Sequence, residues 1–143
     1  MSGIVFSILA GIFVSLQGVF NTRVSEKIGQ WETTSLVHLS GFVFSILIVL
    51  LFGKGNLGKI GQVNPYYLFG GVFGVIIVFS VIQGISLLGT TFAVAILLVT
   101  QLLVSASIDY FGLFGTQAVR FDFTKVLGLM VMILGIVIFK WKG

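Results

Sequence analysis

Polar side chains recur at a four-residue spacing inside one long apolar segment. Gln101, Ser105 and Asp109 occur within residues 99–112, which are otherwise mostly apolar. On an α-helix, residues four positions apart lie on the same face, so these three side chains would form a polar stripe. An amide, a hydroxyl and a carboxylate can hydrogen-bond a ligand or a neighbouring helix. The stripe is therefore the first candidate for a binding site.

The composition indicates a membrane protein. The 143 residues are 57% hydrophobic and only 8% charged, with a mean hydropathy of +1.19, which a soluble domain of this size could not bury in a single core. Cysteine is absent and there is one histidine. The sequence therefore offers no thiol nucleophile and no set of metal ligands, and we expect neither a metal nor another cofactor.

The distribution of charge and the absence of catalytic motifs exclude other functions. The net charge of +4 comes from basic residues scattered between apolar segments, which argues against a nucleic-acid partner. The sequence contains no HExxH and no GxSxG motif, so we expect no enzymatic activity. The expected partners are membrane lipid, a second copy of the chain and a small-molecule substrate of unknown identity.

Five apolar segments are long enough to cross a bilayer, whose hydrocarbon core is about 30 Å thick. The first has no basic n-region and no small-residue cleavage site, so we interpret it as a retained span rather than a signal peptide. The predicted fold class is an all-α membrane protein with one five-helix transmembrane domain over residues 1–143. The predicted helices are residues 3–21, 33–52, 66–88, 91–111 and 124–139.

Small residues recur at helical spacing within these spans. They let backbones approach closely, which is how helices associate in lipid, where hydrophobic burial between helices gains little. Close packing inside one bundle and dedicated dimer faces both fit the pattern, and we favour the first. The predicted packing positions are Gly11, Gly70, Gly74, Gly128 and Gly135.

The basic residues are balanced across the membrane. An odd number of spans puts the two termini on opposite sides, and the positive-inside rule orients a protein through an imbalance of Lys and Arg. Without that imbalance we predict dual topology and an antiparallel homodimer, similar to the inverted repeats of larger transporters. The alternative is that a smaller asymmetry fixes one orientation. The first side carries Lys54, Lys59, Arg120 and Lys125, and the second carries Arg23, Lys27, Lys140 and Lys142.

His38 and Asp109 are the ionisable residues inside the predicted spans that are the first candidates for a function. Such residues cost about 2.5–3.5 kcal/mol on insertion scales and usually face a cavity or a partner. His38 and Asp109 lie near opposite faces of the membrane within one copy, whereas inversion brings His38 of one copy to the level of Asp109 of the other. We predict that they form a gate or an inter-protomer pair. The alternatives are a histidine hydrogen-bonded between helices and a hydrated carboxylate at the interface.

Neutral polar residues define a predicted substrate pathway. Amides can hydrogen-bond hydroxyl, amide or zwitterionic groups without the full desolvation cost of an ion. Gln101 lies near the middle of its span, where transporters of inverted construction bind substrate. Alternatively, the amides only join helices, through hydrogen bonds worth about 0.6 kcal/mol on average. The predicted pathway residues are Gln17, Asn21, Gln83, Gln101 and Ser105.

Several motifs together resemble the small YdcZ-type family of the drug/metabolite transporter superfamily. The resemblance covers nearly the whole chain, and the Gln…Ile-Asp-Tyr-Phe-Gly signature is its most specific part. The motifs are Q-G-V-F-N-T-R at 17–23, G-G-V-F-G at 70–74, L-G-T-T-F-A at 88–93, T-Q-L-L-V-S-A-S-I-D-Y-F-G at 100–112 and L-G-L-M-V-M-I-L-G at 127–135.

The resemblance implies a five-helix protein of the bacterial inner membrane that forms one half of an inverted-repeat bundle. It implies transport by analogy with the superfamily, in which related small multidrug exporters use a glutamate in their first helix. Here the first predicted span has no acid, and Gln17 is its nearest polar group. We therefore expect an exporter of a small neutral or zwitterionic metabolite that works by alternating access. The alternatives are a non-transporting scaffold or accessory subunit, and a small multidrug exporter.

Overall fold

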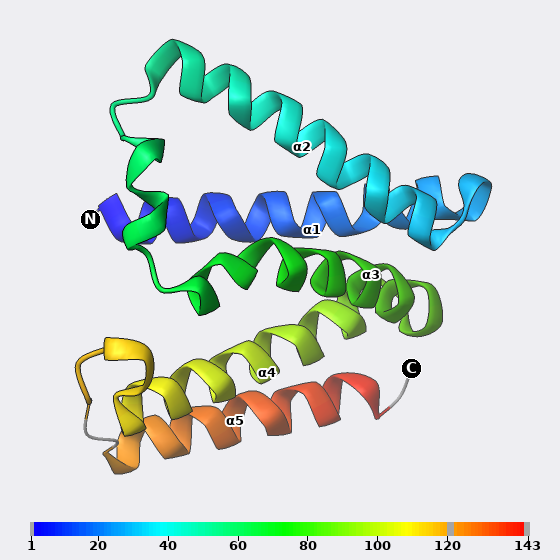
Figure 1. The fold of residues 1–143 in the computed structure, drawn as a ribbon. Helices are drawn as coiled ribbons and strands as arrows, with labels where there is room; N and C mark the ends of the chain where they lie inside the picture. Colours follow the sequence, from blue (N-terminus) through cyan, green and yellow to red (C-terminus); the bar gives the residue numbers. More distant parts are fainter. Residues whose placement is uncertain (1, 120–121, 142–143) are drawn as a thin grey trace. The chain divides into compact units, whose positions relative to one another are not determined.

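The computed structural model describes residues 2–119 and 122–141, and Arg120 and Lys142 of the charge count lie outside these ranges. The described residues form helices and contain no strand, and the five long helices are apolar enough to cross a membrane (Figure 1). The predicted all-α class with five spans is therefore confirmed. The helices are α1 Ser2–Ile28, α2 Gln30–Phe52, α3 Gly70–Leu88, α4 Thr90–Phe111 and α5 Phe123–Lys140, with short 3-10 helices η1 Leu57–Gln62, η2 Pro65–Phe69 and η3 Leu113–Gly115.

The chain divides into two compact units. The N-terminal unit, Met1–Leu87, contains α1, α2, η1, η2 and nearly all of α3. The C-terminal unit, Leu88–Gly143, contains α4, η3 and α5. Each unit is described by itself below.

A single glycine separates α1 from α2. Gly29 has a φ of +97°, a conformation that glycine adopts readily because it has no Cβ. Its N–H donates to the Ser25 carbonyl and its own carbonyl accepts from the Thr33 N–H, so backbone hydrogen bonds close both helix ends. The helix predicted to end at Asn21 therefore continues to Ile28. Apolar patterning locates the part of a helix that lies in lipid, and the helix itself continues through polar residues beyond it.

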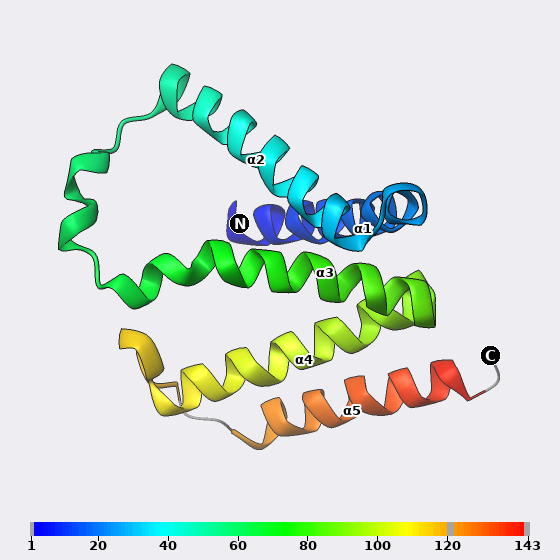
Figure 2. The ribbon, with the colours of Figure 1, turned by 45° about the vertical axis from the view of Figure 1, so that its right-hand side comes forward.

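The buried residues of the N-terminal unit lie where three helices meet. Ile82 and Ile85 of α3 are buried, as are Thr33 and Thr34 at the start of α2 and Thr22 near the end of α1. Each threonine hydroxyl donates to a carbonyl four residues back in its own helix, at 2.7–2.8 Å. These buried hydroxyls therefore need no partner helix. In both ribbon views α2 diverges from α1 toward its C-terminal end (Figures 1 and 2).

Two glycines allow side chains of neighbouring helices to approach closely. A Cβ built on Gly18 would lie 2.8 Å from Ile85 Cδ1 and 3.1 Å from Val81 Cγ1, and one built on Gly74 would lie 3.1 Å from His38 Nε2. Gly74 was predicted as a packing position, whereas Gly18 was not. The remaining predicted positions have no other described atom within 4 Å of a built Cβ, so their packing role stays a prediction. They are Gly11, Gly70, Gly128 and Gly135.

The C-terminal unit is an antiparallel hairpin of α4 and α5, which lie side by side (Figures 1 and 2). Gly112, with a φ of +61°, ends α4, and the Val119 N–H donates to the Asp109 carbonyl at 2.9 Å, which ties the connecting loop back to the helix. Asp122 caps α5 by accepting from the Thr124 N–H and hydroxyl. At the far end, the Lys140 ammonium lies 5.1 Å from the centre of the Phe92 ring.

We expect Gly18→Leu to destabilise the N-terminal unit more than Gly11→Leu. A Cβ at position 18 meets Val81 and Ile85, whereas a Cβ at position 11 has no other described atom within 4 Å. Both changes replace a glycine within α1, so their effects on helix propensity cancel and overpacking should separate them by about 1–3 kcal/mol. Thermal unfolding of the two variants in detergent measures this difference. Equal stability of the two would contradict the close packing of α1 on α3.

Candidate functional site

The predicted site residues are divided between the two units. Gln17, Asn21, His38 and Gln83 belong to the N-terminal unit, and Gln101, Ser105 and Asp109 belong to the C-terminal unit. The structure places each group within its own unit only. Their meeting in a common pathway, and the pairing of His38 with Asp109 of a second copy, stay predictions.

Gln17 and Asn21 border the same concavity on α1. They are four residues apart and therefore share a helix face. The concavity has a volume of about 510 Å³, and its other borders are the apolar side chains of Ala10, Phe13, Val14, Leu16 and Phe20. Gln17 is exposed, while Asn21 is 7% exposed. This face of α1 thus combines two amides with a large apolar surface.

Gln83 joins two helices of the N-terminal unit. Its side-chain amide donates a hydrogen bond to the side-chain oxygen of Gln30, the first residue of α2. Next to this bond, Trp31, which follows Gln30, stacks on Phe79, which lies one turn before Gln83 on α3, with ring centroids 4.2 Å apart. The bond matches the alternative in which amides connect helices. Gln30 was not predicted as a site residue, because it precedes the predicted span and belongs to no recognisable motif.

His38 lies at the contact between α2 and α3. Its Nδ1 is 2.8 Å from the Thr34 carbonyl, and since a carbonyl only accepts, this nitrogen is the donor. Nε2 faces Gly74 of α3, where the missing side chain leaves room for the ring. The hydrogen bond of His38 therefore lies within α2 and does not join it to another helix, and both the interhelical bond and the gating role stay predictions.

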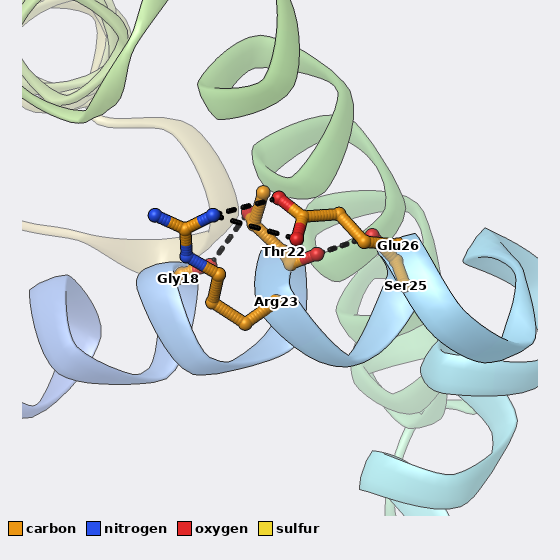
Figure 3. Close-up of polar contacts among 5 residues, drawn as sticks. All are labelled: Gly18, Thr22, Arg23, Ser25 and Glu26. Carbon is orange, nitrogen blue, oxygen red and sulfur yellow. Dashed lines mark hydrogen bonds and ion pairs between the residues drawn. The ribbon is translucent and has the colours of Figure 1, made fainter.

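A cluster of polar side chains lies near the end of α1 (Figure 3). Arg23 and Glu26 form an exposed ion pair at 3.1 Å, and the Ser25 hydroxyl donates to the Thr22 carbonyl at 2.8 Å. An exposed pair of this kind contributes less than about 1 kcal/mol. The 27 residues of α1 span about 40 Å, more than the roughly 30 Å of a hydrocarbon core. The cluster therefore fits a position outside the lipid rather than a binding role.

The polar stripe of the sequence analysis is present on α4. Gln101, Ser105 and Asp109 are all exposed within the described residues. Ser105 and Asp109 border a groove of about 370 Å³ between α4 and α5, whereas Gln101 does not. The remaining borders are Leu102, Ala106, Val119, Lys125, Gly128, Leu129 and Met132.

Lys125 is the site residue that sequence reasoning missed. It was counted only as a charge that sets topology, because the facing of α5 on α4 could not be read from the sequence. The structure places it on the same groove as the Asp109 carboxylate, together with the predicted packing residue Gly128. The groove thus brings a carboxylate, an ammonium group and a hydroxyl together on an otherwise apolar surface.

Asp122 keeps its charge at the start of α5. Hydrogen bonds from the Thr124 hydroxyl and backbone N–H, together with the charge of Lys125, hold the pKa of its carboxyl below the usual value. A lowered pKa stabilises the folded chain above the unfolded value of about 3.9, and this contribution is lost as the pH falls through the folded value. The cap that positions Lys125 is therefore intact at neutral pH.

Among the described residues, no cluster of three or more His, Asp or Glu could hold a metal.

We expect a double-mutant cycle of Gln30→Ala and Gln83→Ala to show coupling. Interhelical hydrogen bonds in membrane proteins contribute about 0.6 kcal/mol on average and up to about 1.7 kcal/mol. Coupling of this size should appear in the free energy of unfolding in detergent. The pair Gln17→Ala and Gln83→Ala is the control, because the described hydrogen bond of Gln83 goes to Gln30 and Gln17 borders a concavity formed by α1 alone. Zero coupling between residues 30 and 83 would show that the bond does not join α2 to α3.

Comparison with known proteins gives one finding. The family model described as "Putative inner membrane exporter, YdcZ" matches residues 2–138, nearly the whole chain. The comparisons with curated proteins and with solved structures found no match. Exporters are transporters rather than enzymes, and five helices able to span a membrane fit a multi-pass inner-membrane location. The chain therefore belongs to the YdcZ family of inner membrane exporters.

Proposed function

We propose that this protein is a secondary transporter that exports a small neutral or zwitterionic metabolite. It works as an antiparallel, dual-topology homodimer, in which two inverted copies alternate access to a central pathway. Membership of an inner-membrane exporter family supports the transport part of this proposal. The choice of substrate class and of pathway residues depends on the polar side chains of the spans.

The observation that carries the proposal is the exposure of amides on apolar helices. Gln17 of α1 and Gln101 of α4 are exposed, and neither side chain forms a hydrogen bond within the described ranges. A polar group left unpaired in hydrocarbon costs several kcal/mol. These two helix faces therefore do not belong against lipid tails. A polar pathway or a second copy would cover them.

An inverted second copy would place equivalent residues at the same depth. Gln101 is the twelfth residue of the 22-residue α4, so in an inverted pair both copies of Gln101 lie near the bilayer midplane. Binding at the midplane between inverted halves is the arrangement of larger secondary transporters. Neutral amides at that depth favour a neutral or zwitterionic substrate over a metal ion or an anion.

Two other functions fit less of the structure. A non-transporting scaffold is favoured by the Gln30–Gln83 bond, which joins helices without any need for substrate. That function explains the exposure of Gln17 and Gln101 only if a second copy covers both of them. A multidrug exporter that uses an acid in its first helix would need a carboxylate within the embedded part of α1. The acid of α1 is Glu26, which pairs with Arg23 at the polar end of the helix.

Export and the role of Gln101 are tested together in proteoliposomes. Vesicles containing the protein are loaded with a mixture of neutral and zwitterionic metabolites, and mass spectrometry of the external medium detects efflux. We expect Gln101→Ala to reduce efflux at least fivefold with the dimer intact on gel filtration, and Thr100→Ala, one residue off the stripe, to reduce it little. Absence of efflux from wild-type vesicles would contradict transport, and loss of the dimer in Gln101→Ala would make Gln101 a helix-joining residue.

Dual topology is tested by accessibility labelling in cells. The chain has no cysteine, so Ile28→Cys and Gln62→Cys each provide one exposed thiol, on opposite sides of the predicted topology, without changing the balance of Lys and Arg. We expect an impermeant maleimide to label roughly half of each variant from outside, because both orientations are populated. Leu134→Cys, within α5, should remain unlabelled in both assays. Labelling of each loop variant from one face only would contradict dual topology.

A further inference from the structure

The groove between α4 and α5 has a charged end and an apolar end. Because the two helices are antiparallel, moving from Asp109 to Leu102 on α4 and from Lys125 to Met132 on α5 leads in the same direction, away from the connecting loop. Each path covers seven residues, or about 10 Å of helix. Asp109 and Lys125 therefore border one end, and Leu102 and Met132 border the other.

The charged end lies at the expected membrane boundary. Asp109 is in the last turn of α4 and Lys125 is in the first turn of α5, while Asp122 caps the same end outside the groove. Ser105 borders the groove one turn further in. A molecule with a charged head and an apolar body would lie in a bilayer in the same orientation as this groove.

We propose that this groove binds a small zwitterion with an apolar body. The ammonium group lies against the Asp109 carboxylate, the anionic group lies against the Lys125 ammonium, and the body follows Leu102, Leu129 and Met132. The proposal rests on the transport function above, because it narrows the substrate to the zwitterionic class and assigns Lys125 to the site. The same chemistry occurs in free amino acids with apolar side chains and in phosphatidylethanolamine.

Opposite charges on one groove favour a zwitterion over a simple ion. The two charges that line the groove are opposite, so a cation or an anion alone would pair with one of them and be repelled by the other. Asp122, whose pKa is lowered by Thr124 and by the charge of Lys125, is close to Lys125 but does not line the groove. A zwitterion can contact both. The apolar border then favours a hydrocarbon body over a sugar, because hydroxyl groups would be desolvated there without partners.

The size of the groove fits a small ligand. A volume of about 370 Å³ lies near the lower end of the roughly 300–1,000 Å³ range of small-molecule sites. Gly128 contributes to this space, because a Cβ built on it would meet no other described atom within 4 Å. A side chain added at position 128 therefore starts in open space on the groove and is expected to occupy it.

The test is equilibrium binding to the full chain in detergent, measured by isothermal titration calorimetry. The probe with all three features is leucine. Isoamylamine lacks its carboxylate, 4-methylpentanoate lacks its ammonium group, and glycine lacks its apolar body. We expect leucine to bind at least tenfold more tightly than each of the others. Native mass spectrometry tests lipid binding, on protein extracted from nanodiscs of phosphatidylethanolamine or of phosphatidylglycerol. Retention of phosphatidylethanolamine by the protein would identify this lipid as the zwitterion that the groove binds.

The variants separate the groove from a general effect on folding. Asp109→Asn and Lys125→Met remove one charge each, and Gly128→Leu fills the groove. Gly135→Leu is the matched control, since Gly135 lies two turns along α5, is equally open and does not border the groove. We expect Asp109→Asn, Lys125→Met and Gly128→Leu each to weaken binding of the zwitterion that the wild-type protein binds, leucine or phosphatidylethanolamine, at least tenfold. The control Gly135→Leu should change this binding less than twofold.

Two outcomes would overturn the proposal. The first is that neither leucine nor phosphatidylethanolamine shows binding that depends on Asp109 and Lys125. The second is that Gly128→Leu and Gly135→Leu weaken zwitterion binding equally. These results are independent of the efflux assay. Efflux of other metabolites without zwitterion binding would overturn this inference alone, whereas zwitterion binding without any efflux would overturn only the proposed transport.

Discussion

A polar group inside a bilayer has to find its partner within the protein, because no water is available there. Serine and threonine meet this requirement locally, by donating to carbonyls three or four residues back in their own helix. The geometry leaves these hydroxyls without any need for a neighbouring helix, so they can lie on lipid-facing or on buried surfaces alike. They are Ser7, Thr22, Ser25, Thr33, Thr34, Ser40, Ser45 and Ser107.

The same requirement separates the remaining polar residues into two groups. Gln83 is satisfied by Gln30 of α2, and His38 is satisfied by the Thr34 carbonyl of its own helix. Gln17, Gln101 and Asp109 remain exposed on their helices. Gln17 and Gln101 have no hydrogen-bond partner among the described residues of their own units, so something else would have to cover them inside a bilayer. This division is the physical basis for assigning function to the exposed group.

Local patterns predicted the helices well and the contacts between them poorly. Hydropathy located five spans because lipid imposes a length and an apolar composition on every crossing helix. It could not show that α1 continues past Asn21 to Ile28. Hydropathy detects only apolar residues, whereas Arg23 and Lys27 are charged and still form helix well outside the lipid. The close approach at Gly18 and the facing of Lys125 toward the α4 groove depend on how helices rotate about their axes. Periodicity alone does not fix that rotation, because these spans are apolar on nearly every face.

The one-residue link at Gly29 limits how this chain can be extended or cut. Both backbone groups of Gly29 are engaged in closing helix ends, so an inserted fluorescent protein or protease site there would break α1 and α2 together. The segment between α2 and α3 has two short 3-10 helices with exposed residues and gives room for such an insertion. An epitope tag therefore belongs between Gly53, which closes the end of α2, and Asn56, which caps η1, where new sequence would leave both helix ends intact.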